Sequence, residues 1–290
     1  MTALRTGNLS IGGSGAIGRR GLSLSIGTIL ALYAIVTVYP LVWMVFSAFK
    51  TDRAFFLEPF SLPSEWMLSN FSKAWSVGKM GIGFSNTIGV TLCSLVLTLL
   101  VGSLASYILS RFRFKLKPAI VGMFMVGMLI PIHSTLVPLF IIMKQLHLLN
   151  TYAALILPYT AFSLPVAIFV ISAFMATVPR ELEEAAFVDG SGIWGFFVRI
   201  MLPISRPALA TTGILSFLSF WNEYAFALVF ISKASLKTLP LSLNIFTSGF
   251  STSYGLTLAA ITIAAIPTIV IYILFQEQVM KGMTAGAVKG

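Results

Sequence analysis

The sequence predicts an all-α membrane protein with six transmembrane helices. Hydrophobic residues make up 57% of the 290-residue chain and charged residues only 10%, whereas soluble domains contain about 25% charged residues. The apolar residues form segments of about 20 residues or more, which is long enough for a helix to cross a bilayer. Polar stretches with prolines, glycines and basic residues separate these segments. Composition and segment length together exclude a soluble fold.

The apolar segments cover residues 22–279, which we expect to form one six-span domain. The first, 22–49, is too long for the apolar core of a signal peptide and lacks a small-residue cleavage site, so it should stay as an anchor. The other spans are expected at 83–109, 118–143, 152–176, 208–231 and 255–279. Residues 1–21, rich in Gly and Ser, are expected to form a mobile basic N-terminus, and residues 280–290 a tail.

Basic residues set the expected orientation. Six spans place both termini on one side, and the 19 Lys and Arg residues then divide into 12 on that side and 7 on the other. Because basic residues favour the cytoplasm, both termini and the loop between spans four and five are expected there. The net charge of +10 is therefore interpreted as an orientation signal and not as a nucleic-acid surface. The basic stretch 111–117 is expected to anchor an inner loop at lipid phosphates.

The longest polar break in the second half of the chain, 177–207, has the pattern helix, turn, helix. Glutamates occupy the first turn of the first helix, where negative charge meets the positive end of the helix dipole. Leu182, Ala185, Ala186 and Asp189 share one face of that helix, and Gly190 can supply its left-handed cap. From these residues alone, an amphipathic hairpin lying on the membrane surface is an equally good interpretation.

Eight positions in this break carry a more specific signal, with fixed spacing and no gap: Glu184, Ala185, Ala186, Asp189, Gly190, Ile200, Leu202 and Pro203. The segment resembles the EAA signature of the membrane subunits of ABC importers. The resemblance implies the type I permease fold of ABC importers, with a cytoplasmic coupling helix between spans 4 and 5. In that family the coupling helix docks in a groove on the ATP-binding subunit, so these eight residues are predicted to form that interface.

Other segments are similar to the carbohydrate-uptake subgroup of ABC importers. They are LLNTY at 148–152, LILP at 155–158 and WNE at 221–223. The ending GMTAGAVKG at 282–290 resembles the maltose permease G subunit, from which Met283 and Ala287 depart. The resemblance implies a tail that inserts between two ATPases, with Gly286 and Lys289 as contacts. Ala287 in place of glycine reduces backbone freedom at one point of that tail.

Glu223 is the one acid well inside an apolar segment. An ionised carboxylate facing lipid is costly, so Glu223 should face the bundle interior or water. One interpretation is a polar position on the solute path, with Asn222, Trp221 and Tyr224 as further path residues. Trp221 and Tyr224 could add flat surfaces on which sugar rings stack, or could simply pack. The alternative is a structural hydrogen bond between helices, in which Asn222 is the expected partner.

The function implied by the resemblance is that of a permease subunit of an ATP-driven importer for a sugar or oligosaccharide. The chain has no complete Walker motif, and the glycine pattern at 13–18 lacks the preceding strand that nucleotide binding needs. We therefore expect no enzyme activity and no cofactor in this chain, with ATP and Mg bound by partner subunits. The single cysteine, Cys93, excludes an internal disulfide.

The resemblance also implies the partners: a second homologous permease, two ATP-binding cassette subunits and an extracellular or periplasmic solute-binding protein, all at a bacterial inner membrane. Two alternatives stay open. One is an ABC permease for a non-sugar solute, which would keep the coupling loop without the sugar-subgroup segments. The other is an ion-coupled secondary transporter, whose sequence would be expected to contain inverted repeats and several buried ionisable groups.

Overall fold

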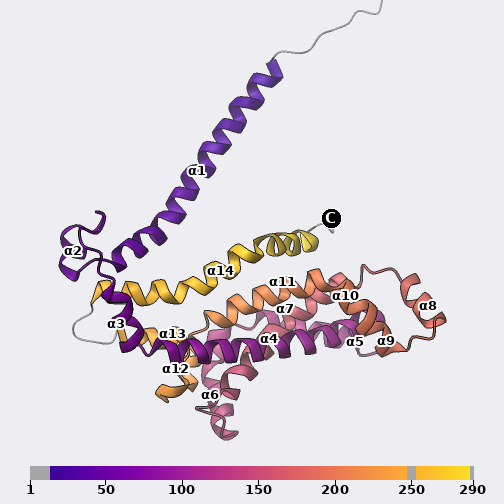
Figure 1. Cartoon of the computed structure of the whole chain (residues 1–290). Coiled ribbons are helices and arrows are strands. Elements are labelled where there is room, and N and C mark those ends of the chain that lie inside the picture. Colours follow the sequence, from indigo (N-terminus) through magenta and orange to yellow (C-terminus); the bar gives the residue numbers. More distant parts are fainter. Residues whose placement is uncertain (1–13, 247–252, 288–290) are drawn as a thin grey trace, which may run out of the picture.

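The computed structural model describes residues 14–246 and 253–287, with side chains for 25–246 and 253–277. These residues form helices joined by short connections, and no strand occurs among them. Figure 1 shows the arrangement. The elements, in chain order, are α1 (Ser14–Ala48), α2 (Asp52–Leu57), α3 (Ser69–Val77), α4 (Met80–Arg111), α5 (Lys117–Leu129), η1 (Ile132–Thr135), α6 (Leu136–Gln145), α7 (Ala153–Met175), α8 (Glu181–Val188), α9 (Ile193–Phe196), η2 (Phe197–Met201), α10 (Leu202–Ile204), α11 (Arg206–Trp221), α12 (Ala225–Phe230), η3 (Ala234–Leu236), α13 (Leu239–Ser242), η4 (Leu243–Phe246) and α14 (Tyr254–Ala287).

Four helices are each long and apolar enough to span a membrane: the described part of α1, α4, α7 and α14. Two further spans are present if each bent pair of helices counts as one, which gives the six that the sequence predicts. The predicted third span is one of these pairs, because the chain turns by 97° between α5 and the segment η1–α6. Pro131 lies at this bend, where its missing N–H and fixed φ oppose a continuous helix.

The predicted fifth span, 208–231, is not one continuous helix. Helix α11 ends at Trp221, and α12 starts only at Ala225. The break therefore falls on Asn222, Glu223 and Tyr224, the residues that the sequence singled out. At its other end α11 forms a second bent pair, since the segment Ile193–Ile204 meets it at 71°.

Helices α4, α7 and α11 lie side by side in the centre of the bundle (Figure 1). Small residues let α4 and α7 approach closely, as is common between membrane helices. A Cβ atom added at Gly102 would lie 3.3 Å from the Cβ of Ala167. The hydroxyl of Ser106 donates to the carbonyl of Ile168 at 3.2 Å, across the same interface.

Helix α1 leaves the bundle, while α14 lies between α1 and the central helices (Figure 1). None of the 18-residue apolar window of α1 is buried within this chain. Such a surface suits contact with lipid or another membrane protein, because apolar side chains there would be unfavourable in water. The helix begins at Ser14, inside the stretch 1–21 that was expected to be mobile.

Candidate functional site

Helix α8 and the connection after it form one end of the molecule (Figure 1). Three glutamates occupy the first turn of α8, as predicted from the sequence. The helix ends in a Schellman motif: Gly190 N–H donates to Phe187 O at 3.0 Å, and Ser191 N–H donates to Ala186 O at 2.8 Å. Gly190 has φ +82°, the left-handed conformation that the cap requires and that glycine adopts without strain. The cap fixes the angle at which the chain leaves α8 for α9.

The eight residues that match the EAA signature divide into two groups. Glu184, Ala185, Asp189, Gly190 and Pro203 are exposed, where a partner could reach them. The other three face the protein interior: Ala186 belongs to a buried apolar cluster, and Ile200 and Leu202 pack against it.

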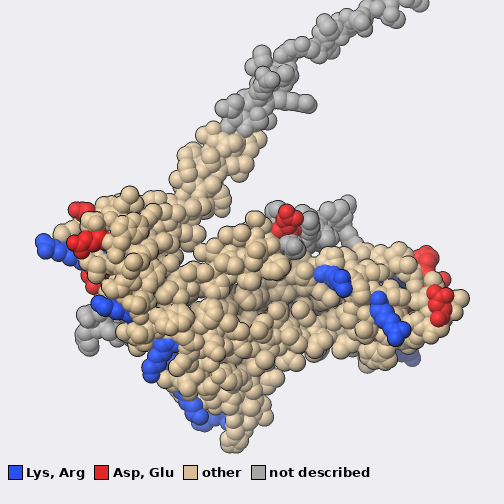
Figure 2. Space-filling view, viewed as in Figure 1, with Lys and Arg blue, Asp and Glu red and all other residues tan. Residues whose placement is uncertain are grey.

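Exposed apolar side chains complete this surface, and the sequence analysis did not identify them. Val188 is 87% exposed and Trp194 66% exposed, with Leu182 and Ile193 also exposed beside them. Acidic side chains gather at the tip of the α8 end with basic side chains close by, charged side chains also gather at the opposite end, and the surface between is mostly uncharged (Figure 2). The sequence did contain a signal that could have identified them, since large apolar residues are unusual in an otherwise polar loop. An apolar patch with a charged rim is typical of a surface that binds another protein.

Two side chains of α4 hold this loop. Arg111 is almost fully buried, and its Nη2 donates to the carbonyl of Val178 at 2.8 Å. Its Nη1 lies 3.9 Å from a carboxylate oxygen of Glu183. One helical turn earlier, the hydroxyl of Tyr107 donates to the carbonyl of Ile193 at 3.2 Å. The prediction that the 111–117 stretch contacts lipid phosphates is therefore wrong for Arg111, which points into the protein. Of the other basic residues, Arg113 and Lys115 are exposed and Lys117 is half-buried.

A cavity of about 280 Å³ lies between α7, α11 and α12. Its lining combines aromatic rings with small hydroxyl side chains and one carboxylate: Tyr159, Phe162, Phe220, Phe226, Ser163, Thr212, Ser216, Ser219 and Glu223 are among its residues. Two of the lining hydroxyls, those of Ser163 in α7 and Ser216 in α11, are 3.0 Å apart and bond to each other. An aromatic lining with a few polar groups is typical of small-molecule sites. Tyr159, Phe220 and Phe226 are almost fully buried and pack on one another, so Phe162 is the ring best exposed to the cavity.

Glu223 lies at this cavity and also closes the helix break. Its Oε2 accepts from the hydroxyl of Tyr159 at 2.5 Å and from the N–H of Ala227 at 3.3 Å. Its Oε1 accepts from the N–H of Phe226 at 2.7 Å. These backbone groups are among the first N–H groups of α12, which have no partner within the helix. Glu223 thus caps α12 and joins it to α7, while its partly exposed side chain borders the cavity.

The structure does not bring the other three predicted path residues to this cavity. Trp221 is buried on the far side of α11, where it stacks on Phe217 and its N–H points to Ala264 O at 3.5 Å. Asn222 bonds to its own helix and to Thr268 of α14 and not to Glu223. Tyr224 is 38% exposed and is not part of the cavity lining.

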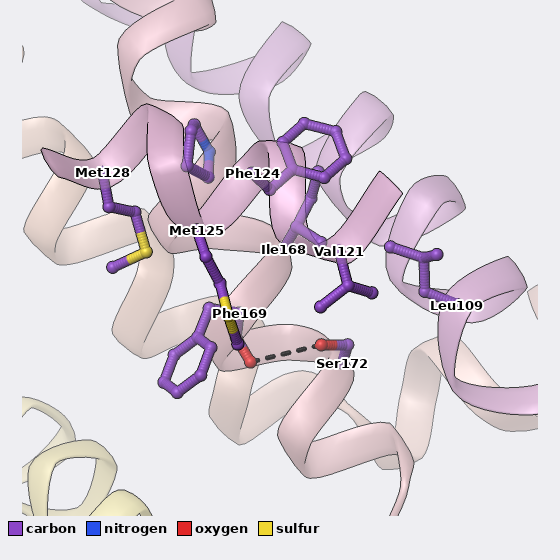
Figure 3. A pocket seen from close by; sticks show the side chains of 9 residues that line it. Leu109, Val121, Phe124, Met125, Met128, Ile168, Phe169 and Ser172 are labelled. Atoms are coloured by element: carbon purple, nitrogen blue, oxygen red, sulfur yellow. Dashed lines mark hydrogen bonds between the residues drawn. The ribbon is translucent and has the colours of Figure 1, made fainter. Parts of the chain in front are cut away.

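A second hollow lies between α5, α7 and the end of α4 (Figure 3). It encloses about 40 Å³, and its lining is apolar except for Ser172. The Ser172 hydroxyl already donates to Phe169 O at 3.3 Å, as the dashed line in Figure 3 shows. This hollow is too small and too apolar to hold a sugar ring.

The predicted tail contacts lie at the edge of the described chain. Gly286 falls within α14, which continues to Ala287, and Lys289 lies outside the described residues. Among the side chains that the structure describes, no group of three His, Cys, Asp or Glu residues could hold a metal ion.

Comparisons with known proteins agree with this geometry. Residues 98–284 match the family described as "binding-protein-dependent transport system inner membrane component". The chain is 42% identical over 266 residues to the probable ABC transporter permease protein YurM of Bacillus subtilis, covering 92% of this chain and 88% of that protein. It is 31% identical over 260 residues to the diacetylchitobiose uptake system permease protein NgcG of Streptomyces coelicolor, covering 89% and 86%.

Solved structures show the same fold. A chain of a bacterial ABC transporter involved in import of the acidic polysaccharide alginate matches with a TM-score of 0.67 at 13% identity, covering 95% of this chain and 99% of that chain. A second structure, of a bacterial alginate ABC transporter in complex with alginate pentasaccharide-bound periplasmic protein, matches with a TM-score of 0.62 at 15% identity, covering 90% and 94%.

Proposed function

The chain belongs to the family of binding-protein-dependent transport system inner membrane components, and from this premise we propose that it carries a sugar or oligosaccharide across the membrane as one permease subunit of an ABC importer. The observation that carries the proposal is the exposed helix pair α8–α9. It presents exposed apolar side chains among charged residues of both signs, and two side chains of α4 hold it to the bundle. A partner subunit that moves can push on such a segment, because its surface is accessible and its base is held to the bundle.

We assign the α8 end to the cytoplasm and the α8–α10 segment to contact with an ATP-binding cassette subunit. The bias of basic residues supports this orientation, with both termini on the same side. Glu184, Asp189 and Gly190 would lie at the contact, with Val188 and Trp194 as apolar anchors. Closure of two ATP-binding subunits on ATP would then displace this segment and change the side to which the transport path opens.

Two observations favour a sugar as the solute: the residues that line the cavity, and the sugars named for related permeases. Four aromatic rings and several hydroxyls surround the cavity, and Glu223 can accept hydrogen bonds at its rim. Related permeases are described as taking up diacetylchitobiose, and as taking up melibiose, raffinose and stachyose. We propose Glu223 as a polar position on the path, whereas Trp221, Asn222 and Tyr224 lie outside the cavity and are not proposed as solute contacts.

The remaining partners follow from the type of transporter. A second homologous permease would complete the path, and the exposed apolar length of α1 leaves room for it. A solute-binding protein would deliver the sugar at the end opposite α8. ATP and Mg would be bound by the partner ATPases, and the tail with Gly286 and Lys289 would reach between them.

Affinity purification of the tagged chain from its native membrane tests the assembly. We expect an ATP-binding subunit and a second permease with an EAA-type loop to purify with it. Cells lacking the chain should lose ATP-dependent uptake of one member of a panel of radiolabelled oligosaccharides, such as maltotriose, raffinose and diacetylchitobiose. Recovery of the chain alone, active in ion-driven uptake, would overturn the proposal. An intact ABC complex whose binding protein ignores sugars would instead favour a permease for another class of solute.

A further inference from the structure

Helix α4 is the longest of the described helices that have no proline inside them. It contains 32 residues and no proline, whereas prolines lie inside α1, α7 and α14. At 1.5 Å per residue it is about 48 Å long. Helices bend mainly at prolines and at Gly/Ser pairs. The one such pair in α4, Gly102-Ser103, lies where α4 packs closely on α7, which supports the backbone there, so α4 is the helix best suited to move as a rigid body.

The α8 end of α4 is joined to the loop that we propose contacts the ATPase. Arg111 donates to the carbonyl of Val178, which precedes α8 in the chain, and Tyr107 donates to the carbonyl of Ile193, which follows it. Hydrogen bonds from a charged guanidinium are stronger than neutral ones, and burial excludes competing water. The ring of Tyr107 also packs against Phe197, with centroids 4.9 Å apart. The loop therefore cannot move far without α4.

The opposite end of α4 is joined to a different segment, residues 234–242. The Nδ2 atom of Asn86 donates to the carbonyls of Ser235 and Lys237 at 2.8 and 3.0 Å. The backbone N–H of Leu239 donates to the hydroxyl of Thr87 at 2.7 Å. Asn86 is buried, and its Oδ1 accepts from the hydroxyl of Tyr152 at 2.7 Å, so all of these polar groups are fixed.

We infer that α4 is the rigid connector between the ATPase-side loop and segment 234–242, with Arg111 and Asn86 as the positioning residues at its two ends. The inference rests on the proposed function, because it presumes that the α8–α10 loop is displaced by ATP. The helices that adjoin the loop in sequence are less suited to this role. Two prolines lie inside α7, and α11 meets the loop at a 71° bend. Segment 234–242 includes the exposed Ser235 and follows the exposed Lys233, so its displacement reaches the surface proposed to meet the solute-binding protein.

Distance measurements between two spin labels test this connection. The labels replace two exposed residues, Arg53 in α2 and Lys233 directly before η3, in a chain where Cys93→Ser removes the native thiol. The labelled chain is purified with its partner subunits and measured without nucleotide and after trapping with ATP and vanadate. The unmutated complex should show a nucleotide-dependent change in the distance distribution.

Arg111→Met should lower the fraction of complexes that show the nucleotide-dependent distance change, and the reduction should be about tenfold or more. A charged hydrogen bond of this kind shifts a two-state equilibrium by at least that factor. Arg111→Lys keeps a charged donor and should restore much of the change. Arg113→Met removes an exposed arginine two residues away and should leave the change intact. Asn86→Leu, at the other end of α4, should cause the same loss as Arg111→Met without touching the loop.

The outcomes separate this inference from the proposed function. If no ATP-binding subunit purifies with the chain, or the unmutated complex does not respond to nucleotide, the proposed function fails. If the unmutated complex responds and Arg111→Met responds fully with its ATPases still bound, the connector role of α4 is overturned. If Arg111→Met does not assemble, Asn86→Leu decides: a full response in that variant overturns the inference, and a lost response supports it.

Discussion

Replacing the two partners of the Glu223–Tyr159 bond tests whether this carboxylate holds the broken fifth span together. Tyr159→Phe removes the 2.5 Å hydrogen bond between α7 and the break. Glu223→Ala removes that bond and also the two bonds to backbone N–H groups of α12. Glu223→Gln keeps the shape and one acceptor oxygen but removes the charge.

The magnitudes follow from the number and kind of bonds lost. Hydrogen bonds between membrane helices contribute about 0.6 kcal/mol on average and at most about 1.7 kcal/mol. The short bond to a carboxylate belongs near the upper end, so Tyr159→Phe should lower the free energy of unfolding by about 1.5 kcal/mol. Loss of a helix cap adds about 1 kcal/mol, which gives about 2.5 kcal/mol for Glu223→Ala. Glu223→Gln should cost about 1 kcal/mol, because neutral bonds are roughly half as strong as charged ones.

Titration of the purified protein with SDS in mixed micelles, followed by tryptophan fluorescence, measures these differences. Trp221, buried beside the break, is one of the chain's five tryptophans, so the fluorescence follows unfolding of the whole chain. Tyr224→Phe is the matched control, because Tyr224 is partly exposed and lies outside the cavity. Equal stability of Tyr159→Phe and Tyr224→Phe, or a cost below about 0.5 kcal/mol for Glu223→Ala, would refute the capping argument, since lost caps usually cost more.

Uptake by the same variants separates a structural role of Glu223 from a place on the solute path. If Glu223 only caps α12, Glu223→Gln should transport almost normally, and Glu223→Ala should lose uptake in proportion to the protein lost. If the carboxylate contacts solute, both variants should change uptake kinetics at an unchanged amount of assembled complex. Unchanged kinetics in Glu223→Gln would remove Glu223 from the proposed path.

Three further predictions concern glycines and the loop. Gly190→Ala should destabilise the complex by about 1 kcal/mol in thermal unfolding because φ is +82° there, while Gly192→Ala, at φ −80°, should have no effect; equal effects would contradict the cap. Glu184→Lys should leave the chain inserted and assembled but abolish uptake, and normal uptake would remove this residue from the ATPase contact. Gly102→Leu should cost about 1–3 kcal/mol of stability because α4 and α7 are too close there for a larger side chain. Gly89→Leu, in open space on the same helix, should be silent; a matching loss would show that leucine itself, and not the close approach, is responsible.

The features that the sequence determined are those set by neighbours along the chain. Span positions follow from runs of apolar residues, and the observed helices lie within a few residues of the predicted ones at spans two and four. The helix of span six also begins where predicted, but it continues past residue 279 to Ala287. The cap of α8 depends on a glycine directly after the helix, so Gly190 was predictable. The EAA spacing identified the loop because all of its residues lie within one short segment.

The features that only the tertiary structure decided depend on side chains far apart in sequence. Arg111 and Val178 are 67 residues apart, Tyr159 and Glu223 are 64 apart, and Asn86 reaches a carbonyl 149 residues away. A basic residue after an apolar span has the same local pattern whether it faces lipid phosphates or a buried carbonyl, so Arg111 was misassigned. Likewise, Trp221 and Glu223 are neighbours in sequence but point to different surfaces, because the helix breaks between them and each side chain follows its own backbone direction. Local patterns determine which segments are helical, whereas the packing of those helices determines what each polar side chain meets.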